Sequence, residues 1–220
     1  IDRPTLALGR PLRGAARITS EEAGPVRATI ACRRSMGDAG EIVVRYTLEA
    51  GAPQVRIGMD LDLRKPLTLL KMLFPTRFAG RQARFGAPFG SVLRDQVPGG
   101  PAAEAQWEVA ASRWAAVFDE TEAEGLFVAT EAKYGFSVRD GVLGLSLVRS
   151  AQITSEEPPS DRPNSHPHAL RRTHASSPFS DLGRHHIALA VGRHVADAPR
   201  DEQAAAVADL LFTPPVAYQG

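Results

Sequence analysis

The sequence predicts an all-β fold built from antiparallel strands. Apolar and polar residues alternate along several segments with a period of two, which is typical of strands that bury one face. Turn signals such as GAP, FPT and RDG separate these segments at spacings that suit a sandwich better than alternating strands and helices. The 220 residues are 43% apolar, and we expect one domain over residues 1–220 with a substantial core.

The first predicted strands are the segments 26–33, 42–48 and 55–64. Each alternates apolar residues with polar or charged ones. This pattern predicts half-buried antiparallel strands with an apolar inward face and a charged outward face. Further strands are predicted over 69–74, 106–110, 113–119, 125–130 and 185–192.

Two features interrupt the strands late in the chain. The segment DAPRDEQAAAVADLLF (197–212) predicts a short helix, with Asp197 as a candidate cap and Pro199 near its start. Residues 154–181 are rich in proline, serine and charge, so we expect one long surface loop there.

The segment EAKYGFSVRDGVLGLSLVRS (131–150) predicts a β-hairpin. Asp140 and Gly141 tolerate the positive φ that a tight turn requires. Hairpin chemistry does not account for Lys133 and Tyr134 at the far end. A cation beside an aromatic ring suits sugar recognition, although an ion pair for the lysine and a core position for the tyrosine also remain open.

Composition excludes several classes of function. The 26 basic residues are balanced by 25 acidic ones, which argues against a nucleic-acid partner. Cys32 is the single cysteine, so an internal disulfide and a cysteine-based zinc site are excluded. No apolar run approaches the ~20 residues of a membrane span, and we expect a cytoplasmic protein without a membrane partner.

The histidines and one acidic pair are candidates for chemistry. All six histidines lie between residues 166 and 194, but adjacent His185 and His186 would point to opposite faces of a strand. Asp60 and Asp62 would lie about 7 Å apart on one face, within the range of glycosidase carboxylate pairs. Exposed ion pairs are the more ordinary explanation of these two acids, and scattered loop and strand-end positions that of the histidines. We therefore predict no metal ligand and no catalytic residue within the chain.

Six blocks carry a family resemblance. In chain order the sequence resembles the C-terminal β domain of class II α-mannosidases, glycoside hydrolase family 38, at EAGPVRATI, LLKMLFP, APFGSVLR, WEVAASRWAAV, EAKYGFSV and LGLSLVRS. The resemblance implies a galactose-mutarotase-like antiparallel β supersandwich that packs against an upstream catalytic domain. Because the chain also begins without methionine, we expect it to be a C-terminal fragment of a larger glycosidase.

The resemblance also implies an activity for the full-length protein. Family members hydrolyse α-mannosidic bonds with retention and use a zinc ion bound partly by a His-x-Asp motif. None of the histidines here has aspartate two residues later. We therefore expect zinc and the nucleophile upstream of this chain, a fragment that is inactive alone, and an α-mannoside carbohydrate as the partner at a shared pocket wall.

The resemblance implies four candidate substrate-binding residues, each in one of the matching blocks. In the family, an arginine at the end of a strand like LSLVRS is expected to approach the sugar. By this match Arg149 is the leading substrate-binding candidate. Lys133, Tyr134 and Arg94 are the others, each expected either to line the pocket or to brace it. Thr130 stands where relatives usually have asparagine.

Two other functions remain open at this stage. One is a carbohydrate-binding β-sandwich module without an enzyme. The other is a sugar mutarotase on the same fold, which would need a histidine and a glutamate in one cleft for acid–base chemistry.

Overall fold

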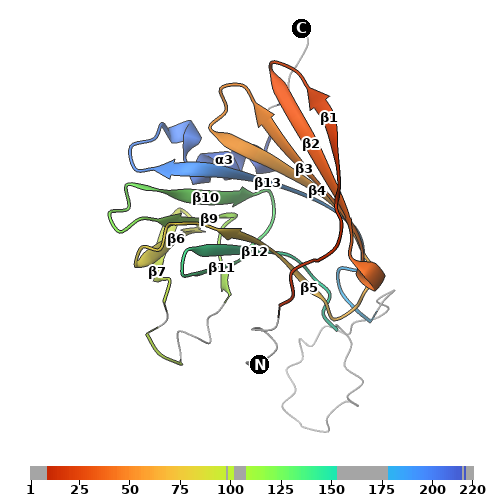
Figure 1. Cartoon of the computed structure of the whole chain (residues 1–220). Coiled ribbons are helices and arrows are strands. Elements are labelled where there is room, and N and C mark those ends of the chain that lie inside the picture. Colours follow the sequence, from red (N-terminus) through yellow and green to blue (C-terminus); the bar gives the residue numbers. More distant parts are fainter. Residues whose placement is uncertain (1–8, 98, 102–107, 153–177, 215, 217–220) are drawn as a thin grey trace.

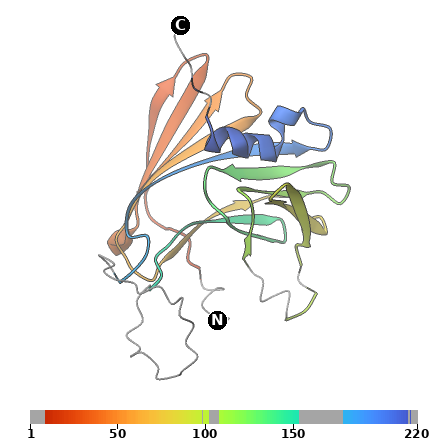
Figure 2. The same ribbon diagram turned by 180° about the vertical axis from the view of Figure 1, so that it is seen from behind.

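The described part of the protein is a two-sheet sandwich with a short helix late in the chain. The computed structural model describes residues 9–97, 99–101, 108–152, 178–214 and 216. A nine-stranded and a four-stranded antiparallel sheet pack face to face (Figure 1). The helix lies against the other face of the larger sheet, as the view from behind shows (Figure 2). The all-β fold with a late helix is therefore confirmed.

The nine-stranded sheet has the order β1-β2-β3-β4-β13-β10-β9-β6-β7. Its strands are β1 (Arg17–Ala23), β2 (Arg27–Ser35), β3 (Gly40–Glu49), β4 (Gln54–Leu63), β13 (Gly183–Val195), β10 (Glu124–Thr130), β9 (Trp114–Phe118), β6 (Gln82–Ala87) and β7 (Gly90–Asp95). The late strand β13 lies between β4 and β10 and pairs with both. It therefore joins the first four strands to the strands from the middle of the chain.

The four-stranded sheet has the order β5-β12-β11-β8. Its strands are β5 (Leu69–Pro75), β12 (Val142–Arg149), β11 (Gly135–Arg139) and β8 (Val109–Ala110). The predicted hairpin is confirmed as β11 and β12, and Asp140 and Gly141 at its turn have φ values of 48° and 75°. The backbone N–H of Gly141 donates to the buried side chain of Gln96 at 2.9 Å, which fixes this turn against the chain after β7.

The core lies between the sheets and follows the period of two. Ile57, Met59 and Leu61 alternate along β4 and are 1–4% exposed. Across the sandwich, Leu143 and Leu145 of β12 are fully buried in the same cluster. The intervening residues of β4 form the charged outer face that the sequence predicts.

The helix α3 (Ala204–Phe212) covers the far face of the larger sheet. Its Ala204, Val207 and Ala208 pack on Phe118 and Phe127 from β9 and β10. The sequence prediction of its start was wrong, because the N-cap position is Gln203 and a separate 3₁₀ turn (Arg200–Glu202) precedes it. Asp197 therefore does not cap the helix. Most of the predicted loop over residues 154–181, namely residues 154–177, lies outside the described residues.

No helix among these described residues has the length and apolar character to cross a membrane.

Candidate functional site

Arg149 lies on the outer face of the four-stranded sheet, which is the face turned away from the larger sheet. A bulge after Ser146 shifts the register of β12 against β5, so that Ser146 lies opposite Lys71 and Arg149 opposite Leu69. Bulges re-aim side chains in this way. As a result Arg149 is exposed on the same face as Ser146, while Val148 between them is 5% exposed.

A polar network lies on this outer face, and its member on β12, Ser146, is three residues before Arg149. Lys71 places its Nζ 3.4 Å from the Glu108 carboxylate and 3.2 Å from the Ser137 hydroxyl. The Ser146 hydroxyl donates to the other oxygen of Glu108. The Lys71 and Glu108 side chains are only 18% and 28% exposed, so the charged pair is largely shielded from water. The network holds these side chains in one arrangement.

Two glycines make room for the network. A methyl group at Gly135 would lie 2.5 Å from the Glu108 carboxylate, and one at Gly144 would lie 2.6 Å from the Ser137 hydroxyl. Real side-chain carbons do not approach so closely. The glycine that follows Tyr134 therefore has a structural reason here, which is to let the carboxylate lie against β11.

The chain before β11 is shaped by Thr130, which is fully buried. Its hydroxyl donates to the Lys133 carbonyl at 2.9 Å and accepts the Lys133 N–H at 3.0 Å. The Tyr134 carbonyl accepts the N–H of Ala111 at 2.9 Å, and the residue is 52% exposed. Tyr134 is thus not a core residue, and backbone hydrogen bonds fix the position of the Lys133–Tyr134 pair.

The structure brings three of the four predicted residues to one end of the smaller sheet. Because β11 and β12 are antiparallel, Lys133 and Tyr134 before β11 lie at the same end as Arg149. The Asp140–Gly141 turn lies at the opposite end.

Arg94 is separated from these three. It lies on β7 opposite Ala83, and the register continues through Val117 to Leu126, early in β10, whereas Lys133 follows the last residue of that strand. Arg94 therefore lies toward the turn end. Its Nε is buried and has no hydrogen-bond partner within the described part of the chain.

The acidic pair of β4 forms exposed ion pairs. Asp62 pairs with Arg64 at 2.6 Å, and Asp60 contacts Arg45 and the Nδ1 of His186. Hydrogen bonds from His186 and Arg45 lower the pKa of Asp60 below its ordinary value. This group lies on the solvent-exposed outer face of the larger sheet, which is a poor setting for catalysis by a pair of carboxylates.

The adjacent histidines of β13 lie on opposite faces of the sheet, as the strand period requires. His186 lies on the outer face beside Asp60, and the ring Nε2 of His185 lies 2.9 Å from the Asp181 carbonyl oxygen. The three histidines at 166, 168 and 174 lie outside the described residues. Over the described ranges, no three His, Cys, Asp or Glu side chains gather closely enough to hold a metal ion.

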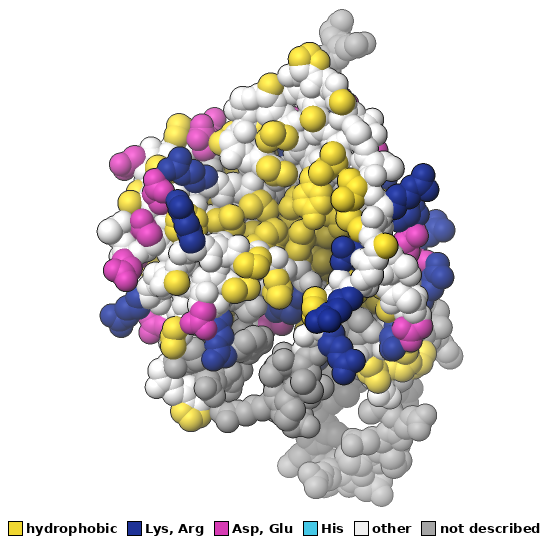
Figure 3. All heavy atoms as spheres, viewed as in Figure 1, with side chains coloured by type: hydrophobic (Ala, Val, Ile, Leu, Met, Phe, Trp, Pro, Cys, Tyr) yellow, Lys and Arg dark blue, Asp and Glu magenta, His cyan; other side chains and the backbone are white. Residues whose placement is uncertain are grey.

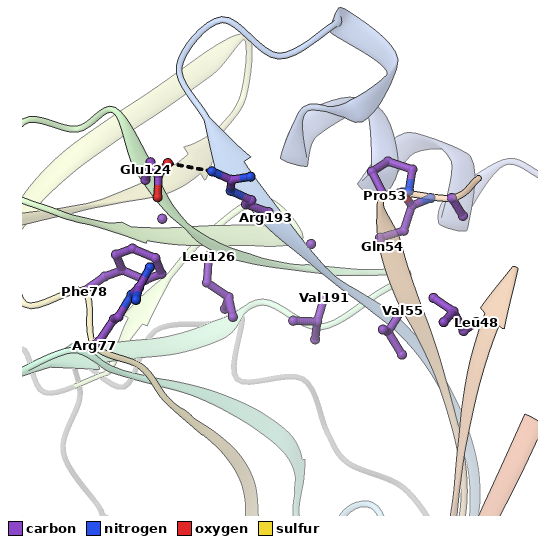
Figure 4. A pocket seen from close by; sticks show the side chains of 13 residues that line it. Leu48, Pro53, Gln54, Val55, Arg77, Phe78, Glu124, Leu126, Val191 and Arg193 are labelled. Atoms are coloured by element: carbon purple, nitrogen blue, oxygen red, sulfur yellow. Dashed lines mark hydrogen bonds and ion pairs between the residues drawn. The ribbon is translucent and has the colours of Figure 1, made fainter. Parts of the chain in front are cut away.

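An open cavity of about 460 Å³ lies between the end of β5 and the strands β3 and β4. Its apolar lining includes Val55, Leu126 and Val191, with an Arg193–Glu124 ion pair of 2.6 Å above them (Figure 4). Its volume is within the range of small-molecule pockets. None of the four predicted residues lines it.

Comparison with known proteins places this fold in context. The family model for the glycosyl hydrolases family 38 C-terminal domain matches residues 8–156. Alpha-mannosidase 2C1 of Mus musculus is 30% identical over 148 residues, which are 67% of this chain and 12% of that protein. The human protein of that name is 33% identical over 103 residues, which are 47% of this chain and 10% of that protein.

A solved structure shares the fold. The crystal structure of an alpha-mannosidase from Enterococcus faecalis V583 superposes with a TM-score of 0.63 at 14% sequence identity, over 84% of this chain and 22% of that one. The chain thus spans only about a tenth to a fifth of the length of these proteins.

Proposed function

Because the chain belongs to the family of glycosyl hydrolases family 38 C-terminal domains, we propose that it forms a non-catalytic wall of the sugar pocket in a longer, retaining α-mannosidase. The observation that carries the proposal is the exposed Arg149 beside an ordered polar network. The alpha-mannosidases it resembles supply the substrate class, an α-mannoside.

Arg149 would act on the substrate through hydrogen bonds. A guanidinium presents several N–H donors in a fixed fork, which suits neighbouring sugar hydroxyls. Lys133 and Tyr134 lie at the same end of the sheet and would extend this surface with an ammonium and an aromatic face. Arg94 lies toward the other end of the sandwich, and for it we propose a bracing role instead.

Zinc does not fit the described residues of this chain. No suitable group of ligands is present among them, so we propose that any zinc of the full-length enzyme is held by its upstream catalytic domain. We also propose a cytoplasmic location, because a chain with one cysteine folds without internal disulfides and so suits a reducing compartment.

The test uses the product of the complete reading frame and an aryl α-mannoside. We expect Arg149→Ala to lower kcat/KM by about 30-fold, equivalent to about 2 kcal/mol, because hydrogen bonds from a charged donor to the substrate are lost. Arg149→Lys should recover only part of this, since lysine lacks the fork. The unfolding midpoint should not change.

Arg33→Ala is the matched control, because Arg33 is an exposed arginine on β2 that pairs with Glu41. It should leave kcat/KM unchanged. A loss of activity in Arg149→Ala that only tracks a loss of folded protein would contradict the proposal. An upstream sequence without a His-x-Asp barrel would favour the carbohydrate-binding module instead.

A further inference from the structure

Among the residues that the structure describes, none covers one part of the inner face of the larger sheet. The smaller sheet packs over the middle of the nine strands, while β1, β2 and β3 extend beyond it (Figure 1). Ile18, Ile30 and Leu48 lie on this extension and are 67%, 48% and 53% exposed. We define the open apolar face as the residues that the strand register places together here: Ile18, Ile30, Cys32, Val44, Tyr46 and Leu48.

The open apolar face continues the sandwich core. Val44 and Tyr46 are half-buried and pack against the core cluster, and they occupy the same alternating positions of β3 as buried Ile42. Figure 3 shows the hydrophobic side chains gathered across a hollow between these strands and the smaller sheet. A soluble protein rarely leaves so continuous an apolar surface exposed unless another chain segment binds there.

The smaller sheet ends beside this surface at its edge strand β5. Within the described residues, β5 pairs with β12 on one side and with no strand on the other. Its single charged residue, Lys71, faces Glu108 on the outer face and so does not protect the edge. Exposed edge strands are usually protected by charge or cover, because their free N–H and C=O groups pair readily with another strand.

The cavity described above lies in the same gap. It is bounded by Arg77 and Phe78 just after β5 and by Leu48 and Val55 of the larger sheet. A strand that ran alongside β5 would pass over this cavity. Its inward side chains would fill it, as they fill the space between paired sheets elsewhere in a sandwich.

We propose that an extended segment from outside residues 1–220 pairs with the free edge of β5 and covers the open apolar face. Strand addition of this kind uses backbone hydrogen bonds for affinity and alternate side chains for specificity. The occupant should therefore alternate apolar residues toward Ile30 and Leu48 with polar residues toward solvent. Its source is the longer polypeptide, because the chain covers only 12% and 22% of the relatives that share its sequence or fold.

Cys32 provides a reporter for this interaction. It is the single cysteine of the chain and is half-buried on the open apolar face. Iodoacetamide labelling, quantified by mass spectrometry of the peptide that contains Cys32, measures its exposure. We expect labelling in residues 1–220 to be at least about tenfold faster than in the product of the complete reading frame. In the longer protein the covering segment must first open to expose Cys32, and the free energy of this opening slows the reaction.

The matched control is Arg33→Cys in a Cys32→Ser background. This position is adjacent in β2 but lies on the opposite face, so its labelling rate should be equal in both proteins. Equal rates at Cys32 would overturn the proposal. A dimer of residues 1–220 in sedimentation with a protected Cys32 would also overturn it, since a second copy would then be the occupant.

A charge substitution gives an independent readout. Ile30→Lys should leave the unfolding midpoint of residues 1–220 unchanged and should lower that of the longer protein, where the lysine would be buried. Equal effects in the two proteins would contradict the proposal. Neither result depends on mannosidase activity, so this inference and the proposed function fail separately.

Discussion

Lys71 and Glu108 form a shielded ion pair between the edge strand of the smaller sheet and the start of β8, with their charged atoms 3.4 Å apart. The pair joins segments 37 residues apart in the chain. Removing one partner leaves the other charged group poorly paired, which is the costly case for a shielded pair.

The first prediction concerns this pair. Lys71→Met should lower the free energy of unfolding by about 1–3 kcal/mol, because the shielded Glu108 carboxylate loses the positive charge that pairs with it. The double substitution Lys71→Met with Glu108→Gln should recover part of the loss. Urea denaturation measures both. Lys65→Met is the control, because it breaks the exposed Lys65–Asp38 pair and should cost much less than Lys71→Met. Equal costs for the two variants would show that shielding does not strengthen the Lys71–Glu108 pair.

The second prediction concerns Gly135. Gly135→Ala places a methyl group 2.5 Å from the Glu108 carboxylate and should destabilise the protein by about 1–3 kcal/mol through overpacking. The cost should fall when Glu108 is also changed to alanine. Gly58→Ala is the control, since a methyl group there meets nothing within 4 Å. If thermal or urea unfolding showed the same cost at both glycines, close approach to Glu108 would not be the cause.

The third prediction concerns Thr130, whose hydroxyl makes both bonds to the Lys133 backbone. Thr130→Val keeps the shape and removes the hydroxyl, so it should cost about 1–3 kcal/mol by leaving the Lys133 N–H and carbonyl unpaired. Thr130→Ser should cost less. In the full-length enzyme we expect the valine variant to raise KM for an aryl α-mannoside, because the Lys133–Tyr134 segment loses its fixed position. Unchanged KM would argue that this segment does not touch the substrate.

The fourth prediction concerns pH. Burial, and next the charge of Arg84, lower the pKa of His194 below its ordinary value of 6.5, in spite of Glu122 and Asp119 nearby. Its ring packs on Phe118, with centroids 4.6 Å apart. Because the folded state binds the proton less well than the unfolded state, stability is full above pH 6.5 and falls as the pH drops through the folded pKa.

His194→Gln should reduce this fall when unfolding is measured between about pH 7.5 and pH 5. His185→Gln is the control, since the ring Nε2 of His185 lies against a backbone carbonyl, that of Asp181. Identical pH profiles for His194→Gln and the unchanged protein would show that another group controls the acid response.

The sequence pattern predicts some strands and not others for a physical reason. β4 buries every second residue, so its period is plain. β1 and β7 expose almost all of their residues and therefore carry no apolar alternation. The helix prediction extended too far toward the N-terminus. Asp197 is a residue type that often caps a helix, but a separate turn over Arg200–Glu202 lies between it and the helix.

The candidate site is only partly predictable for a similar reason. Arg149, Lys133 and Tyr134 were identified through the family resemblance, and the hairpin register explains why they share one end. The Lys71–Glu108–Ser137–Ser146 network was missed, because its members come from four strands or strand ends and no local pattern links them. The glycine after Tyr134 was the available signal, and its meaning appears only once Glu108 lies against it.

The central position of β13 has a consequence for biosynthesis. Within this chain the first four strands are made before β6, β7, β9 and β10, and the strand that joins the two groups, β13, is made after both. Until residues 183–195 are made, β4 and β10 each present an unpaired edge. The nascent protein therefore passes through a period in which two partial sheets cannot yet join, because the strand that pairs with both has not been made. Non-local strand pairing of this kind is slow and prone to aggregation.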